Sequence, residues 1–184
     1  MRKLSIALVT AALAAACANP AARRPDAARF DLGPVRAGPP MASVTAVIVD
    51  APSWLAGAAM QYRLAYCDPA RRREFAESRW AAPPAELIGQ ALERRLVGGS
   101  GRCRLHIDID EFVQVFDAPE RSALVLAGRA ALLVGADVVD RRDFVVARPA
   151  PTADARGGVA AAAEAVSVLN EELAAWLAHG QRCR

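Results

Sequence analysis

The sequence predicts an α+β fold, a two-layer sandwich in which two amphipathic helices cover one face of a mostly antiparallel sheet. Two segments, 84–96 and 159–177, repeat apolar residues at helical spacing. Runs of alternating apolar and polar residues, typical of half-buried strands, lie before the first segment and between the two. The chain has 184 residues, of which 54% are hydrophobic, enough for one buried core. The order strands, helix, strands, helix favours both helices on the same face of the sheet.

The first sixteen residues have the layout of a lipoprotein signal peptide. Arg2 and Lys3 precede an apolar stretch, residues 4–16, that is too short to span a bilayer. Cys17 follows three alanines directly, which resembles a bacterial lipobox, although the third residue before the cysteine is Ala where Leu is commoner. We expect cleavage before Cys17 and lipidation of its thiol. An ordinary secretory cut near Ala16 is the alternative.

The first half of the remaining chain predicts a tether, a hairpin and a helix. Residues 17–40 are rich in Ala and Pro, as in a semi-rigid tether with a possible short edge strand at 29–32, and residues 41–184 form a single domain. A β-branched strand is expected at 43–49, and a hairpin over residues 60–78, with strands at 60–66 and 73–78. Pro84 suits the first position of a helix, which the glycine-rich run at 98–101 ends.

The second half predicts a β-meander and a closing helix. The meander strands are expected at 103–116, 122–139 and 144–148, with turns at 117–120 and 140–143. The alternation of the first of these strands changes phase near Glu111 and Phe112, which indicates a β-bulge. Gly157 and Gly158 precede the final helix, whose apolar stripe faces the sheet.

Composition and motifs exclude several classes of function. Without Arg2 and Lys3, 21 of the 23 basic residues remain against 20 acidic residues. This nearly neutral net charge does not favour a nucleic-acid-binding surface, which needs clustered basic charge. Motifs typical of serine hydrolases, zinc proteases and P-loop enzymes are absent from the sequence. His106, Asp108 and Asp110 project to one side of a strand and could bind a metal, but the water-facing side of any strand has this pattern. We expect no enzymatic activity, no cofactor and no metal.

The four cysteines suggest one disulfide. With Cys17 lipidated, Cys67, Cys103 and Cys183 remain in an exported compartment that permits disulfides. Cys103 begins a central strand and Cys183 follows the last helix, so the two meet if that helix runs antiparallel to the strand. We predict this pair and leave Cys67 unpaired. Three free thiols are the alternative.

The order of several short motifs resembles the ABC-type transport auxiliary lipoproteins, the family of paraquat-inducible protein C. The lipobox is one of these motifs. The others, over about residues 28–179, are Phe30-x-Leu32, Ala51–Leu55, Met60–Arg63, Glu74–Trp80, Pro83-Pro84, Asp110–Phe112, and Leu169 with Leu173. One departure is the loop at 56–59, where many members carry an Asp-Arg-Pro-Gln-like sequence and this chain has Ala-Gly-Ala-Ala.

The resemblance implies a non-enzymatic role in lipid transport. Its implied partners are a protein with MCE (mammalian cell entry) domains and the inner-membrane ABC transporter of the same system. The implied location is the periplasm, with the lipid on Cys17 inserted in the inner leaflet of the outer membrane. The expected partner surface contains Trp54, Leu55, Met60 and Tyr62, although Met60 and Tyr62 could instead cap the core. The alternatives are another small lipoprotein of envelope assembly or secretion, and a periplasmic module that binds lipid or a small ligand.

Overall fold

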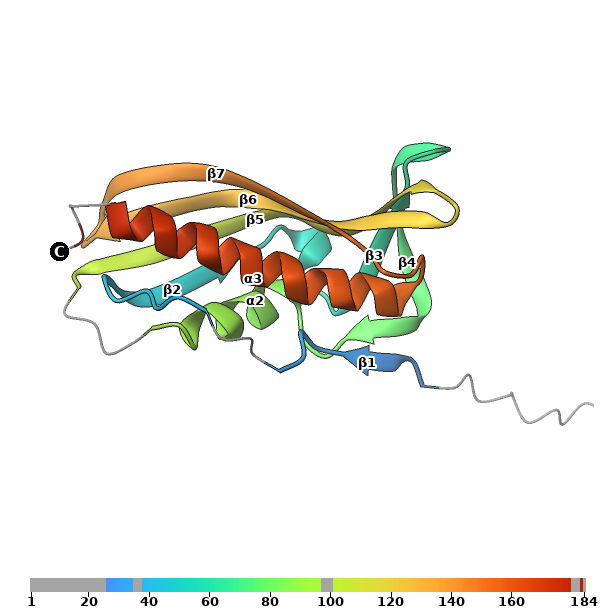
Figure 1. Ribbon diagram of the computed structural model, residues 1–184, viewed down its shortest axis with the longest axis horizontal. Helices are drawn as coiled ribbons and strands as arrows, with labels where there is room; N and C mark the ends of the chain where they lie inside the picture. Colours follow the sequence, from blue (N-terminus) through green and yellow to red (C-terminus); the bar gives the residue numbers. More distant parts are fainter. Residues whose placement is uncertain (1–25, 35–37, 97–100, 180–182, 184) are drawn as a thin grey trace, which may run out of the picture.

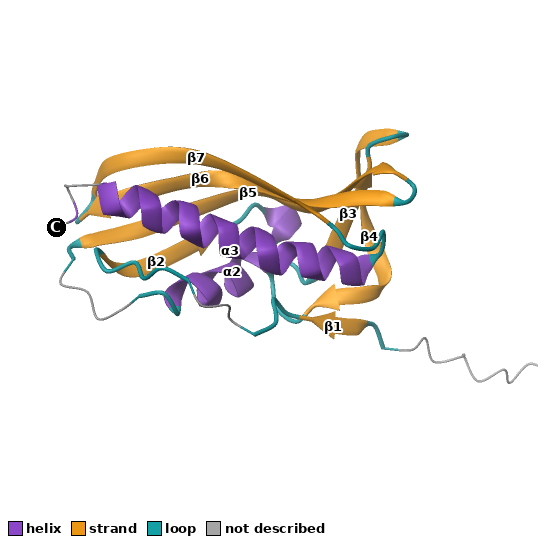
Figure 2. Ribbon diagram, in the orientation of Figure 1, coloured by secondary structure: helices purple, strands orange, loops and turns teal. Residues whose placement is uncertain are grey.

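The computed structural model describes residues 26–34, 38–96, 101–179 and 183 (Figure 1). Its described strands form one mixed sheet, and helices α2 (Pro84–Glu93) and α3 (Ala155–His179) pack against it (Figure 2). The predicted α+β class is therefore confirmed. The signal peptide, Cys17 and most of the glycine-rich run at 98–101 lie outside the described residues. None of the described helices is long and apolar enough to cross a membrane.

The sheet is built around one long strand, β5 (Cys103–Ala118). One edge of β5 pairs antiparallel with β6 (Arg121–Val134), which pairs antiparallel with β7 (Asp137–Pro149). The other edge of β5 pairs with two parallel strands in succession. Its first half joins β2 (Val44–Asp50), and its second half joins β3 (Ala59–Leu64). The chain thus brings residues from both sides of the η2 segment (Ser53–Leu55) against the same strand.

The hairpin of β3 and β4 (Asp68–Trp80) confirms the predicted hairpin, with a longer second strand. β1 (Ala28–Phe30) adds to this hairpin as a parallel edge strand and pairs with the end of β4. The predicted edge strand is therefore present, although it begins and ends earlier than expected. Phe30 and Leu32 pack against the core, so part of the expected tether belongs to the folded unit.

A β-bulge lies in β5 where the sequence predicted it. The register with β6 shifts between Ile109 and Glu111. Before the shift, the side chains at 105, 107 and 109 are buried; after it, those at 112, 114 and 116 are buried. The bulge therefore keeps the core-facing side chains, apolar apart from Gln114, on one face over the whole strand and turns Glu111 to the other face.

The predicted turn at 140–143 is wrong. Residues 135 and 136 form the turn, and Gly135 adopts φ +63°, a conformation that glycine takes without a steric penalty. β6 consequently ends at Val134, and the polar run at 140–143 lies within β7. There Asp140 accepts a hydrogen bond from the Trp176 indole N–H at 3.2 Å, which anchors α3 to the strand.

The expected start of the final helix also needs correction, because Gly157 and Gly158 lie inside α3. Asp154 caps the helix: its carboxylate accepts a hydrogen bond from the Gly157 N–H at 2.7 Å. Both glycines are buried, and a Cβ at Gly157 would overlap the Thr152 carbonyl oxygen. The glycines therefore allow a close approach between the first turn of the helix and its surroundings.

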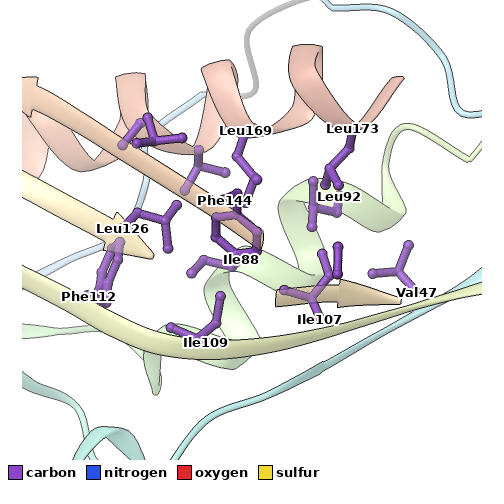
Figure 3. Packing of buried hydrophobic residues seen from close by; sticks show 14 of the residues in the cluster. Val47, Ile88, Leu92, Ile107, Ile109, Phe112, Leu126, Phe144, Leu169 and Leu173 are labelled. Atoms are coloured by element: carbon purple, nitrogen blue, oxygen red, sulfur yellow. The ribbon is translucent and has the colours of Figure 1, made fainter. Parts of the chain in front are cut away.

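The core lies between the helices and the sheet (Figure 3). Side chains from the two helices meet those of the central strands, among them Ile88, Leu92, Leu169, Leu173, Ile107, Ile109, Phe112, Leu126 and Phe144. α3 contacts β6 and β7, whereas α2 contacts β2, so the helices share the same face as predicted. The opposite face is the more polar one and carries charged residues such as Arg104 and Asp108 of β5 and Arg129 of β6.

The predicted disulfide is confirmed. Cys103, at the start of β5, is bonded to Cys183 with a Cα–Cα separation of 5.1 Å, and both side chains are buried. The bridge ties the chain beyond α3 back to the central strand. Cys67 is a free thiol and is exposed.

Candidate partner-binding site

The structure separates the four residues expected at the partner surface. Trp54 is 53% exposed, whereas Leu55 is 1% and Met60 is 3% exposed. Tyr62 is half-buried and packs against Phe75, with ring centroids 4.7 Å apart. Leu55 and Met60 therefore belong to the core, because the η2 turn directs Leu55 inward and the alternation of β3 directs Met60 the same way. Trp54 remains as the candidate contact residue.

The backbone around Trp54 is held in place on both sides. Within the turn, the Leu55 N–H donates to the Pro52 carbonyl at 2.8 Å and the Ala56 N–H donates to the Ser53 carbonyl at 3.2 Å. The side-chain amide of Gln61, on the neighbouring strand β3, donates to the Trp54 carbonyl at 2.5 Å. The burial of Leu55 anchors the turn to the core. The indole is thus displayed on a fixed backbone, at small cost in conformational entropy on binding.

A network of charged side chains supports the indole. The Arg72 guanidinium lies 5.7 Å from the centroid of the Trp54 ring. Arg72 also donates to Glu111 at 2.6 Å and to the Gln61 side-chain carbonyl at 3.0 Å. The second carboxylate oxygen of Glu111 accepts a hydrogen bond from Arg63 at 2.8 Å. We call Trp54, Gln61, Arg63, Arg72 and Glu111 the Trp54 cluster.

Glu111 organises this cluster through its position at the bulge. Each of its two oxygens binds a different arginine, one from β3 and one from β4. All three side chains are about three-quarters buried, so the ion pairs are shielded from water more than ordinary surface pairs are. Its hydrogen bonds to Glu111 and to the Gln61 side chain fix Arg72 beside the indole.

The cluster lies on the face of the sheet that turns away from the helices. Tyr62 is paired with Gln114, whose side chain bonds to the Asp154 carbonyl before α3, so Tyr62 and Gln114 face the helix side. Alternation places Arg63 and Glu111 on the other side. Exposed Val145 of β7 lies on that side as well, since its register partner Ala127 alternates with the core residue Leu126.

Sequence reasoning identified Trp54 but not the side chains that hold it. Glu111 was noted as the position of a bulge and as part of the Asp110–Phe112 motif, and the arginines on the hairpin were not considered as its partners. Two signals were available: a carboxylate at a phase change in a long strand, and arginines on an adjacent hairpin. Their pairing depends on the parallel contact of β3 with β5, which no local pattern predicts.

The structure groups the polar residues of β5 differently from the set expected from the sequence, His106, Asp108 and Asp110. Asp110 forms an ion pair with Arg129 at 3.3 Å and is not grouped with His106 and Asp108. Instead, Asp50 from β2 lies 2.8 Å from the Nε2 atom of His106, and Asp108 lies 3.8 Å from the same nitrogen.

Comparison with known proteins identifies related folds. No family model and no curated protein matches the sequence. A crystal structure of a protein from Xanthomonas campestris, described as DUF330, is similar with a TM-score of 0.70 and 22% identity, over 82% of this chain and 94% of that one. A crystal structure described as an uncharacterized protein has a TM-score of 0.65 and 15% identity, over 83% of this chain and 99% of that one. The chain thus shares the fold of a DUF330 protein.

Proposed function

We propose that this chain is a lipid-anchored envelope protein that serves as a docking component of an MCE-type ABC lipid transport system. The observation that carries the proposal is the exposed Trp54, held on a rigid turn by the Arg72–Glu111–Arg63 network. The motif order described above supports the choice of system. The shared fold with a DUF330 protein is compatible with it.

Trp54 has the properties of an interface anchor. Tryptophan and arginine are enriched among the residues that dominate binding energy, and here the two side chains lie together. A tryptophan offers roughly 250 Å² of surface, and about half of it is exposed at Trp54. Covering that half at about 25 cal/mol per Å² would stabilise a complex by about 3 kcal/mol. Such a contribution is large for one side chain, so substitution of Trp54 should weaken binding measurably.

The proposed lipid anchor limits how far from the membrane the Trp54 surface can lie. A lipid on Cys17 would tether the domain through the ten residues that precede β1 at Ala28. Ten residues span at most about 35 Å when fully extended. The domain would therefore remain close to the outer membrane, and a partner from the inner membrane would have to cross most of the periplasm to reach it. An MCE-domain protein that shuttles phospholipid across the periplasm fits this requirement.

The test is co-purification of the MCE-domain protein with a tagged form of the chain from detergent-solubilised membranes. Trp54→Ala should reduce capture of that protein strongly, because about 3 kcal/mol corresponds to roughly a hundredfold in affinity. Val138→Ala is the matched control, an exposed apolar residue of β7 beside the β6–β7 turn. Equal capture by wild type and Trp54→Ala, or failure of the wild type to capture the MCE-domain protein, would contradict the proposal.

Glu111→Gln tests the contribution of the charged network separately from that of the Trp54 indole. This variant keeps Trp54 and the shape of residue 111 but weakens the charge-assisted hydrogen bonds to Arg63 and Arg72. We expect an intermediate loss of capture and a change in tryptophan emission that does not occur when Glu111→Gln is made in Trp54→Ala protein, because Arg72 is no longer fixed beside the ring. Unchanged capture and fluorescence would show that the network does not position Trp54.

A further inference from the structure

We infer that Asp50, His106 and Asp108 form a binding site for a divalent transition-metal ion of the zinc type. One ligand atom from each residue lies within 4.8 Å of the other two. The Nε2 atom of His106 is the centre of the group, at 2.8 Å from a carboxylate oxygen of Asp50 and 3.8 Å from one of Asp108. This site is independent of the proposed docking function.

All three ligands lie on β-strands, and none lies on a loop. His106 and Asp108 are two residues apart on β5 and so share one face. The parallel register pairs Asp50 of β2 with Asp108, which brings in a third ligand from 56 residues before His106. Because backbone hydrogen bonds join the two strands, the Cα positions of all three ligands are fixed before an ion binds. Sites on strands hold ligands more firmly than sites on loops.

The spacing fits a small tetrahedral ion. Zinc binds histidine nitrogen and carboxylate oxygen at about 2.0–2.2 Å, which places neighbouring ligand atoms roughly 3.3–3.5 Å apart. The observed separations of 2.8 and 3.8 Å from His106 Nε2 lie on either side of this value. Small rotations of the two carboxylates would therefore equalise them. Three protein ligands leave a fourth position for water or a ligand atom from a partner.

The donor set selects the class of metal. An imidazole nitrogen with carboxylates suits zinc and its neighbours in the first transition row, whereas calcium and magnesium prefer all-oxygen sites. Two carboxylates also balance the charge of a divalent ion. The absence of a cysteine ligand disfavours Cu(I), which prefers sulfur.

Most of the arginines near the proposed site have partners outside it. Arg129, opposite Asp108 on β6, forms its ion pair with Asp110. Arg104 donates to the Gly135 carbonyl at 2.5 Å. Arg141, Arg142 and Asp143 line the same depression as His106 and Asp108. Of these, Arg142 donates to the Glu172 carbonyl at 3.5 Å and lies 5.9 Å from the centroid of the Trp176 ring.

Zinc titration of the purified full chain tests the inference. The protein carries no histidine tag and has Cys67→Ser, which removes the exposed free thiol as a competing ligand. Calorimetry should show one zinc site. His106→Ala and Asp50→Asn should each weaken zinc binding by at least about tenfold, the lower limit seen when even a supporting residue of a metal site is lost. His179→Ala, the other histidine, should leave binding unchanged.

A second measurement uses the unsubstituted residues and so does not depend on the folding of any variant. Adding zinc should shift the ¹⁵N resonance of Nε2 of His106 more than that of its Nδ1 or of either His179 nitrogen. Absence of saturable zinc binding would overturn the inference. So would zinc binding that leaves the His106 resonances unchanged, or that is as tight in His106→Ala as in the parent protein.

Discussion

Loss of the Cys103–Cys183 disulfide should destabilise the protein by several kcal/mol. The bridge joins residues 80 positions apart, so in the unfolded chain it closes a long loop. In the chain-entropy model a loop of this size corresponds to about 4.5 kcal/mol at 25 °C. A domain of this size loses about 2 kcal/mol of unfolding free energy per molar urea. Removing the bridge should therefore lower the urea midpoint by about 2 M.

The assay is urea unfolding followed by far-UV circular dichroism, with every variant in a Cys67→Ser background to prevent disulfide exchange. Cys103→Ala, Cys183→Ala and the double variant should have nearly the same midpoint, because either substitution alone removes the whole bridge. Reduction of the parent protein should lower its midpoint similarly. Cys67→Ser alone should leave the midpoint unchanged, since this residue is exposed and unbonded. A double variant within about 0.3 M of the parent, or fully additive single effects, would refute the reasoning.

Four further substitutions test other features of the fold and the proposed lipid anchor. Gly128→Ala should destabilise the fold by about 2 kcal/mol in urea unfolding, because its Cβ would overlap a carbonyl oxygen of β5. Gly89→Ala is the control: its Cβ would meet a β2 valine methyl group at 3.6 Å, an ordinary contact, so this variant should be neutral or stabilising. Asp154→Ala should cost about 1 kcal/mol at pH 7. Hydrogen bonds from the Gly157 N–H and then from the neighbouring threonine hydroxyl lower the pKa of Asp154. The stability difference between wild type and Asp154→Ala should therefore be complete above the ordinary aspartate pKa and be lost as the pH falls through the lowered pKa of the folded protein. Unfolding curves measured over a series of pH values test this. Cys17→Ser should give soluble or unprocessed protein, and mature-size protein that still fractionates with membranes would contradict the lipid anchor.

Local patterns were sufficient to predict most of the elements. The two helices, the hairpin of β3 and β4 and the bulge in β5 each follow from the spacing of apolar residues over a short window. The turn between β6 and β7 was misplaced because the charged run at 140–143 looked more like a turn than a lone glycine did. Gly135 makes the turn with a positive φ. The charged residues instead line β7, where Asp140 holds the α3 indole.

The candidate sites depend on contacts between distant segments, which local patterns do not contain. Asp50 meets His106 only because β2 pairs parallel with β5, and Glu111 meets Arg72 only because β3 pairs with the second half of the same strand. Leu55 was grouped with Trp54 because the two are adjacent. In a tight turn, however, adjacent side chains point in different directions, and one becomes core while the other is exposed.

We propose that Trp54 contacts an MCE-domain protein of the envelope. The most direct measurement is site-specific photo-crosslinking in living cells, with a photoreactive amino acid at position 54 and, as control, at position 138. We expect a crosslinked product that contains the MCE-domain protein from position 54 and none from position 138. Crosslinking to the MCE-domain protein from position 138 but not from position 54, or from neither, would contradict it.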